Sequence, residues 1–374
     1  MQRIQNLQKE LPKQGLNALL ISKPHNVQYL SNFIGSNRHL FITPKKAFLI
    51  TDFRYFRSAK KQLMKGIDVY DRNKGLKSLI GKYKTVGFED QFITVAELAG
   101  LKKAVLKVKF KPIGDLLEKV RMIKEPSEIR IIKKAVKITE EVLKKFEKTI
   151  KVGQSEHEME WKLLSIIRKL GGDDFSFPPI ISFGKETADV HHLKENRRLK
   201  KREKVLIDFG IKYKGYHTDM TRVFYLPTNK KTKFEIRNLP AGRQGSKLEK
   251  NSKSKTQIKD SEQIIYSTVL EANLAAIKAI KVGRKFSEID WAARKVIEDA
   301  GFGEYFGHST GHGVGLIIHE LPHVGEKSDD IVAPGMVFTI EPGIYIEGIG
   351  GVRIEDMVYV NSKGKVEVLT KFPK

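Results

Sequence analysis

An internal repeat is the feature that most limits the possible folds of this chain. The segment "KTIKVG" at 148–153 recurs as "KAIKVG" at 278–283. The same offset of 130 residues aligns Trp161 with Trp291, the only two tryptophans of the chain. Self-similarity at a fixed offset indicates two structural units of the same kind.

Two further pairs of segments follow in the same order. "VHHL" at 190–193 resembles "IHEL" at 318–321, and "IDFG" at 207–210 resembles "IEPG" at 340–343. The offset drifts by a few residues, as it does when loops differ in length. We therefore expect two related halves that face each other across a pseudo-twofold axis, each with a hairpin that carries carboxylates.

The residues before the repeat predict a separate α/β domain. Strand patterns at "LNALLIS" and "TVGFED" lie on either side of a hairpin pattern, "HLFITPKKAFLITDFRYF". Pro126 then begins a helix pattern in which apolar residues recur at helical spacing. We place the boundary between domains 1–122 and 123–374.

Three more helix patterns and one insertion complete the second part. Ser155 and Glu158 form a capping-box signature before the first helix, and the other two are expected at about 262–280 and 287–300. Residues 229–261 are polar and basic and contain almost no aromatic residues. Such a composition predicts a flexible surface insertion, with a basic tether for an acidic partner as the alternative.

Composition limits the chemistry and the compartment. The chain has no cysteine, which excludes disulfides and a thiol nucleophile and leaves only oxygen and imidazole ligands for a metal. No segment approaches the roughly 20 apolar residues of a membrane span, so we expect a cytoplasmic protein without a membrane partner. The 69 Lys and Arg against 44 Asp and Glu give a net charge of +25. Because the lysines are scattered, this charge favours a solvated surface over a nucleic-acid site.

The segment "VLIDFGIKYKGYHTD" contains the first pair of candidate acids. Apolar residues alternate along the strand, so Asp208 lies on the face opposite to them. If Tyr213 and Lys214 form the turn, Asp219 on the returning strand faces Asp208 directly. Exposed acids in a hairpin are common, so this pair alone does not establish a site.

The second half adds two acids and a cluster of histidines. "TIEPGIYIEGIGGVRIED" is a hairpin pattern with Glu341 on one strand and Glu355 on the other, and "FGHSTGHGVGLIIHELPH" contains His308, His312 and His319. Converging carboxylates repel one another unless a cation neutralises them. Four carboxylates and one imidazole fit two divalent ions about 3.5–4 Å apart. This ligand set favours Mn²⁺, Co²⁺ or Fe²⁺, with Zn²⁺ as an alternative, and indicates a dinuclear hydrolase.

The ordered motifs "DFGIKYKGYHTDMTR", "HSTGHGVGLIIHE", "TIEPGIY" and "GGVRIED" resemble the pita-bread metallopeptidases of the aminopeptidase P and Xaa-Pro dipeptidase (prolidase) branch. "HNVQYLSNF" and "TDFRYF" resemble the creatinase-like N-terminal domain of that branch. The resemblance implies an α/β N-terminal domain and an α+β pita-bread catalytic domain with an internal pseudo-twofold repeat.

The resemblance also implies a metal-binding role for five residues, namely Asp208, Asp219, His312, Glu341 and Glu355. In it, Asp219 and Glu355 bind both ions, and Glu341 also serves as the base. Mn²⁺ is the first expectation for both ions.

Four more roles come from the same resemblance. His191 and His319 would hold the scissile peptide and stabilise its oxygen during attack, and His308 would contact the proline side. Arg353 would support the carboxylate cluster. The remaining histidines of these segments, His192 and His323, we interpret as structural or rim residues.

The expected function is hydrolysis of Xaa-Pro bonds in peptides by a homodimer, most closely as aminopeptidase P, which releases the residue before proline. The alternative is a prolidase restricted to dipeptides. A catalytically silent binding protein of this fold generally lacks metal ligands, whereas all five are present, and a creatinase-like amidinohydrolase works without them. The stretch "KETADVHHL" and Thr218 depart from the family pattern, which leaves the substrate preference open.

Overall fold

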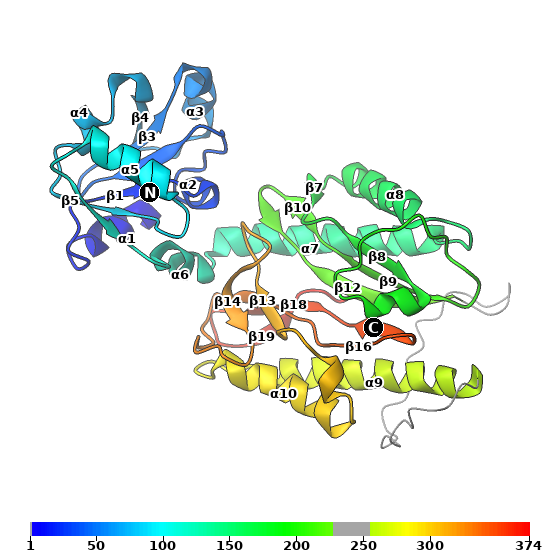
Figure 1. Cartoon of the computed structure of the whole chain (residues 1–374). Coiled ribbons are helices and arrows are strands. Elements are labelled where there is room, and N and C mark those ends of the chain that lie inside the picture. Colours follow the sequence, from blue (N-terminus) through cyan, green and yellow to red (C-terminus); the bar gives the residue numbers. More distant parts are fainter. Residues whose placement is uncertain (1, 227–254) are drawn as a thin grey trace. The chain divides into compact units, whose positions relative to one another are not determined.

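The computed structural model describes residues 2–226 and 255–374, and the chain divides into two compact units, 1–120 and 121–374 (Figure 1). Most of the expected insertion, residues 229–254, lies outside the described residues. Its last part, residues 255–261, belongs to helix α9 (Lys255–Ala279). The helix that we expected from about 262 therefore begins earlier, and the insertion is shorter than predicted.

A mixed six-stranded sheet in the order β4-β3-β2-β1-β5-β6 forms the first unit. Its strands are β1 (Ala18–Ile21), β2 (His39–Ile42), β3 (Ala47–Thr51), β4 (Ile67–Asp71), β5 (Thr85–Phe88) and β6 (Lys109–Pro112). The predicted strands at "LNALLIS" and "TVGFED" are confirmed as β1 and β5, which pair in parallel, and the predicted hairpin is β2–β3. Every residue of β1 is buried, as expected where elements cover both faces of a sheet.

The helices of this unit are α1 (Gln2–Glu10), α2 (Pro24–Ser31), α3 (Phe56–Gln62), α4 (Lys77–Ile80), α5 (Val95–Ala104) and α6 (Leu116–Met122), the last of which leads into the second unit. One core cluster packs α4 against the sheet through Leu79, Ile80, Leu20, Phe41 and Val86. The predicted α/β character of the N-terminal part is therefore confirmed.

The second unit has four long helices that lie on the outside of its strands (Figure 1). They are α7 (Pro126–Phe146), α8 (Glu156–Lys169), α9 and α10 (Phe286–Asp299). One core cluster joins α7 and α8 to β8 (Ile180–Phe183), β9 (Lys204–Phe209) and β12 (Met220–Tyr225). Another joins α9 and α10 to β15 (Val337–Ile340), β17 (Gly350–Arg353) and β18 (Asp356–Val360). Each half thus packs a pair of helices against its own strands.

The remaining strands are short. They are β7 (Asp174–Phe175), β10 (Ile211–Tyr213), β11 (Tyr216–His217), β13 (Gly311–Gly313), β14 (Glu320–Val324), β16 (Gly343–Ile346) and β19 (Val366–Val368). β13 joins β14 to β15, so the histidine-rich segment lies in the same five-stranded sheet as β18.

The internal repeat is visible in the structure. Helices α8 and α10 both have 14 residues and begin 130 positions apart, as the sequence offset predicts. Gly153 and Gly283, the last residues of the repeated "KVG", have φ angles of 90° and 87°. Both are followed by an isolated bridge, at Ser155 and Lys285 respectively. The two halves therefore share local backbone geometry as well as sequence.

The predicted turn of the first hairpin is wrong by one residue. Tyr213 pairs with Tyr216, so Lys214 and Gly215 form the turn, with φ angles of 50° and 82°. Two consecutive positive φ angles are typical of a type I′ turn, for which glycine is favoured. As a result Asp208 pairs with Thr221 rather than with Asp219. Because the shift is two residues in register, Asp208 and Asp219 remain on one face as diagonal neighbours.

The predicted hairpin around Glu341 and Glu355 is present but interrupted. β16 pairs with β17 near its turn, and β15 pairs with β18 beyond the interruption. Pro342 lies at the break and has no N–H to donate to a ladder. Glu341 follows β15 directly and Glu355 precedes β18 directly, so both acids lie at the break.

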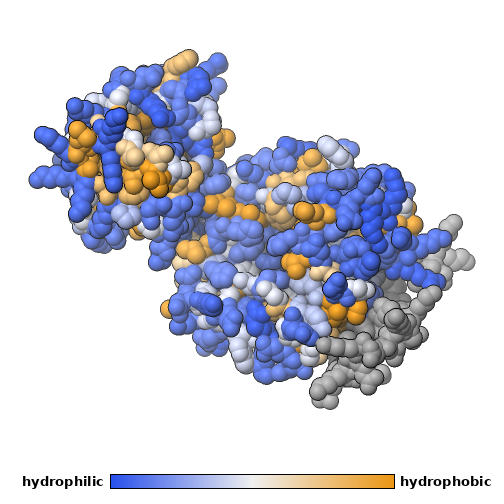
Figure 2. All heavy atoms as spheres, viewed as in Figure 1, coloured by the Kyte–Doolittle hydropathy of each residue, from blue (hydrophilic) through white to orange (hydrophobic). Residues whose placement is uncertain are grey.

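The described surface is mostly hydrophilic in the view of Figure 2, and its apolar residues form separate small groups. Trp161 and Trp291 are both exposed, at 70% and 59%. Among residues 2–226 and 255–374, no helix is long and apolar enough to cross a membrane.

Candidate metal centre

Interruptions in two strand pairs bring the four candidate carboxylates together. Asp208 lies near the end of β9, and Asp219 directly precedes β12. In the other half, Glu341 lies between β15 and β16, and Glu355 lies between β17 and β18. Gly210 makes the first interruption possible, because a Cβ at this position would collide with the carbonyl of Thr218. Equivalent places in the two halves therefore carry the acids.

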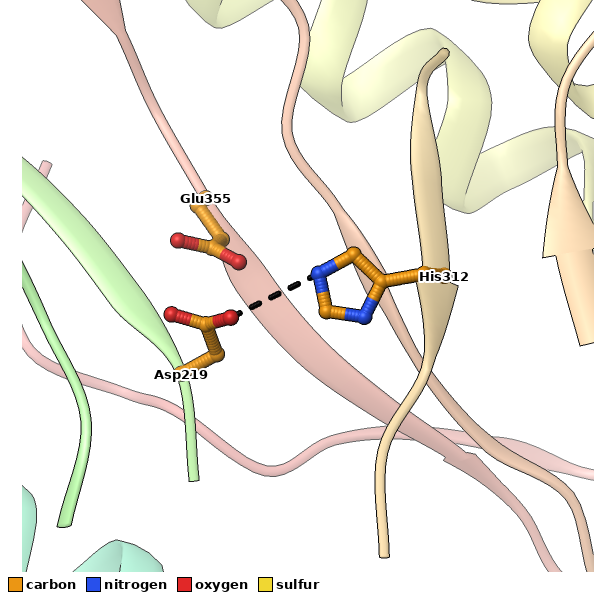
Figure 3. Close-up of side chains that lie close together, drawn as sticks. All are labelled: Asp219, His312 and Glu355. Carbon is orange, nitrogen blue, oxygen red and sulfur yellow. Dashed lines mark ion pairs between the residues drawn. The ribbon is translucent and has the colours of Figure 1, made fainter. Parts of the chain in front are cut away.

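Three ligand-type side chains converge in the structure (Figure 3). The candidate ligand atoms of Asp219, His312 and Glu355 all lie within 4.8 Å of one another. His312 Nε2 is 3.5 Å from Asp219 Oδ2 and 3.3 Å from Glu341 Oε1. Both separations exceed the usual 2.7–3.2 Å of an N–H···O hydrogen bond. The group therefore resembles a set of ligands around a cation more than a closed hydrogen-bond network.

The backbone sets the orientation of the His312 ring. Nδ1 lies 3.1 Å from the carbonyl oxygen of Gly313, to which it can donate. In that tautomer the lone pair of Nε2 points toward Asp219 and Glu341, as metal binding requires. Thr339 completes this support, since its hydroxyl accepts from the His312 N–H and donates to Glu341 Oε1 at 3.1 Å.

Asp208 is held by a buried guanidinium group. Arg353 Nη2 donates to Asp208 Oδ2 at 2.6 Å, and Nη1 donates to the Tyr345 hydroxyl at 2.8 Å. The Nε atom of Arg353 donates to Thr221 Oγ1, which itself donates to Glu355 Oε2 at 2.8 Å. One arginine thus connects candidate ligands from both halves of the second unit.

The negative charges of the four carboxylates are not fully balanced by the positively charged side chains around them. Burial and the charges of Asp208 and Glu341 raise the pKa of Asp219 well above its usual range. Burial and the neighbouring Asp219 do the same to the pKa of Glu355. Burial also raises the pKa of Glu341, against the opposing effect of His312.

Three buried oxygen atoms of the cluster have no hydrogen-bond partner among the described residues, namely Asp208 Oδ1, Asp219 Oδ1 and Glu355 Oε1. Buried carboxylate oxygens in native proteins are ordinarily paired. Divalent cations would satisfy these atoms and neutralise the repulsion, so the residues present fit the binding of divalent metal ions.

The three other candidate histidines differ in their surroundings. His308 is half-buried, with Nδ1 2.8 Å from the Ser309 carbonyl oxygen and Nε2 2.9 Å from the Tyr345 hydroxyl, so both nitrogens are engaged. His191 and His319 are exposed. Desolvation lowers the pKa of His319 to about 4, and that of His308 to about 4, so both rings are neutral near pH 7. His191 is close enough to influence both of these pKa values.

Tyr345 and Thr221 are site residues that the sequence analysis did not select. Both lie within quoted motifs, "TIEPGIY" and "DMTR". The spacing gives the signal for Thr221, since it follows Asp219 by two residues in a segment with strand periodicity and is therefore expected on the same face. No comparable signal identifies Tyr345, because its contact with Arg353 depends on the pairing of β16 with β17.

Comparison with known families agrees with this geometry. Residues 130–362 match the model of "Metallopeptidase family M24", and residues 3–123 match "Creatinase/Prolidase N-terminal domain". The chain belongs to metallopeptidase family M24. It is therefore a hydrolase, with the creatinase-like N-terminal domain and pita-bread catalytic domain that the motifs indicate.

The similar solved structures and relatives match this chain over nearly its whole length. An Xaa-Pro dipeptidase from Bacillus anthracis has a TM-score of 0.87 and 35% identity, over 100% of this chain and 98% of that one. An X-Pro aminopeptidase from Thermotoga maritima has a TM-score of 0.81 and 31% identity, over 96% of each. An Xaa-Pro dipeptidase from Pyrococcus horikoshii is 30% identical over 97% of this chain and 95% of its own length.

These matches place the chain among the Xaa-Pro peptidases, whose substrates are peptides. Membership of a metallopeptidase family also implies divalent metal ions, in agreement with the convergence of Asp219, His312 and Glu355.

Proposed function

We propose that this M24 chain uses two divalent ions to hydrolyse Xaa-Pro bonds, and that it releases the N-terminal residue from peptides with proline in second place. The observation that carries the two-ion proposal is the set of three unpaired buried carboxylate oxygens on Asp208, Asp219 and Glu355. One cation cannot neutralise four clustered acids as well as two can. His312 and Glu341 complete the proposed ligand set.

When bound, the two ions supply Lewis acidity and lower the pKa of a water molecule toward neutrality. Glu341 accepts a proton from the attacking water. His319 and His191 donate hydrogen bonds to the peptide and to the oxygen that gains negative charge. Arg353 holds Asp208 in place through a 2.6 Å contact. His308, braced by Tyr345, borders the proline side.

Proline explains why a metal-dependent site is useful. The bond before proline is a tertiary amide without an N–H, and the ring restricts the residue on either side. Peptidases that hydrogen-bond that N–H therefore fail on it. Attack by an activated water with support from His191 and His319 does not need that donor.

The alternative proposal is a dipeptidase limited to Xaa-Pro, which the names of the Bacillus anthracis and Pyrococcus horikoshii proteins favour. The two activities differ in whether the site accepts residues beyond proline. A matched pair, Ala-Pro and Ala-Pro-Ala-Ala, distinguishes them when assayed with Mn²⁺ and with chelator, and Ala-Ala-Ala-Ala serves as the control without proline. Release of alanine from the longer peptide supports the aminopeptidase, and cleavage of Ala-Pro alone supports the dipeptidase.

Substitution of two proposed ligands tests whether hydrolysis depends on the metal ions. Asp219→Ala and Glu355→Ala are expected to abolish hydrolysis while the protein remains folded, as judged by circular dichroism. Full activity in either variant, or no cleavage of any Xaa-Pro peptide by the metal-loaded protein, would contradict the proposal.

We further propose that Mn²⁺ is the native metal and that the chain forms a homodimer in the cytoplasm. Mass spectrometry of the metals in protein isolated from its own cells, light scattering and cell fractionation test these three statements. Zinc as the bound metal, a monomeric mass or a membrane fraction would each overturn the corresponding one.

A further inference from the structure

His191 and His319 are exposed at the site, and no hydrogen bond holds either ring among the described residues. The His319 ring only packs edge-on against the His312 ring, with centroids 4.2 Å apart. A side chain that no hydrogen bond holds is positioned mainly by the backbone that carries it. The question is therefore what fixes these two backbone segments.

The internal repeat points to the next residue in each half. The alignment of "VHHL" with "IHEL" pairs His191 with His319 and also pairs His192 with Glu320. The side chains of His192 and Glu320 are only 5% exposed. In both halves an exposed histidine is thus followed directly by a buried ionisable side chain.

His192 is held by Glu156 at the first turn of α8. His192 Nε2 is 2.9 Å from Glu156 Oε1, and the other oxygen, Oε2, accepts from the Glu195 N–H at 2.7 Å. The Glu156 side chain is fully buried. Its negative charge is favourable at a helix N-terminus. Both oxygens of one rigidly placed carboxylate therefore hold the segment that follows His191.

Glu320 is held by two cations that precede α7. Lys124 Nζ is 2.9 Å from Glu320 Oε1, and Arg121 Nη2 contacts Oε2, with side chains only 1% and 2% exposed. Glu320 Oε2 also accepts from the Ile317 N–H at 3.3 Å. Burial opposes ionisation of Glu320, but Lys124 and Arg121 outweigh it and keep the pKa of this carboxyl below its usual range. The segment that carries His319 is therefore tied to the start of the catalytic unit.

We propose that His192 and Glu320 are positioning residues, which place His191 and His319 for the reaction through two buried polar contacts of different composition. We call His192 with Glu156 the first anchor, and Glu320 with Arg121 and Lys124 the second anchor. A buried polar contact whose atoms are all satisfied restricts the position of the segment that makes it. The catalytic part of this inference rests on the proposed function of His191 and His319.

Nuclear magnetic resonance of the histidine rings tests the anchors without metal or substrate. The full chain is labelled at the Cε1 atom of its ten histidines and studied with chelator present. His191→Gln and His319→Gln assign the two signals. Glu156→Gln is expected to shift and broaden the His191 signal and leave that of His319 unchanged, and Glu320→Gln is expected to do the reverse. Each variant is thus the control for the other.

Glu320→Gln leaves two buried cations without a partner, so Glu320→Asp replaces it if that protein does not fold. The aspartate keeps the charge and shortens the side chain by one methylene, which also moves the segment of His319. A variant that leaves its own neighbour's signal unchanged, or that changes both signals equally, would overturn the proposal.

Kinetics of the metal-loaded enzyme give the second readout. Glu156→Gln is expected to lower kcat about tenfold with little change in KM, because the contacts of His191 strengthen in the transition state. In a His191→Ala background the same substitution should change kcat less than about twofold. An equal loss in both backgrounds would show a merely structural role. Failure of the wild type to cleave Xaa-Pro peptides would contradict the proposed function, whereas the ring signals would still decide the anchors.

Discussion

Arg353 is expected to stabilise the metal-free site. Its side chain is 3% exposed and contacts Asp208, Tyr345 and Thr221. Arg353→Met removes the partner of a buried carboxylate, which typically costs about 3–5 kcal/mol in the free energy of unfolding. Urea denaturation at neutral pH with chelator present measures this loss.

The control for Arg353 is an exposed pair in the same unit. Lys295 and Asp299 are 47% and 64% exposed and lie 2.9 Å apart on α10. Lys295→Met is expected to cost less than about 1 kcal/mol, because water screens such a pair. Similar losses for Arg353→Met and Lys295→Met would show that Arg353 does not stabilise the site.

At the scale of elements, the turn between β10 and β11 offers a stabilising substitution. Lys214 has a φ of 50°, which is unfavourable for lysine and tolerated by asparagine. Asn-Gly is the preferred pair in a type I′ turn, so Lys214→Asn is expected to stabilise the protein by about 0.5–1 kcal/mol. Lys212→Asn, at a strand position of the same hairpin, is the matched control and should not stabilise. Thermal unfolding of both variants decides this, and equal shifts would contradict the explanation.

The same turn shows where prediction from sequence fails. Gly215 is the sequence signal for a turn at 214–215. A shift of two residues in register leaves the alternation of apolar residues unchanged, so the alternation cannot detect it. The predicted faces of the strands are therefore correct, whereas the predicted partner of Asp208 is wrong. The repeat predicted the starts of α8 and α10 well, because local capping and glycine signals recur in it. The beginning of α9 and the contacts of Tyr345 depend on tertiary packing, which a local pattern does not contain.

At the scale of the whole molecule, the acidic cluster makes stability depend on pH when no metal is bound. The folded-state pKa values of Asp219 and Glu355 lie well above their unfolded values, because of burial and neighbouring charge. The folded protein therefore binds more protons than the unfolded chain at pH values between the two. Its free energy of unfolding therefore falls as pH rises from the unfolded-state pKa values to the folded-state pKa values, the reverse of the usual carboxyl case.

Glu355→Gln isolates this effect and connects it to metal binding. Histidines with lowered pKa values, such as His308 and His319, make the free energy of unfolding rise with pH below about pH 6.5. This contribution is the same in the wild type and in the variant. With chelator present, the wild type should therefore lose stability relative to Glu355→Gln as pH rises from 5 to 8. Added Mn²⁺ should make the wild type more stable than Glu355→Gln. An ion at 100 times its Kd stabilises the folded state by about 2.7 kcal/mol, and the variant lacks one of the proposed ligands. Parallel pH profiles for the two proteins, or equal stabilisation by Mn²⁺, would show that Glu355 is not part of a charge cluster that metal ions neutralise.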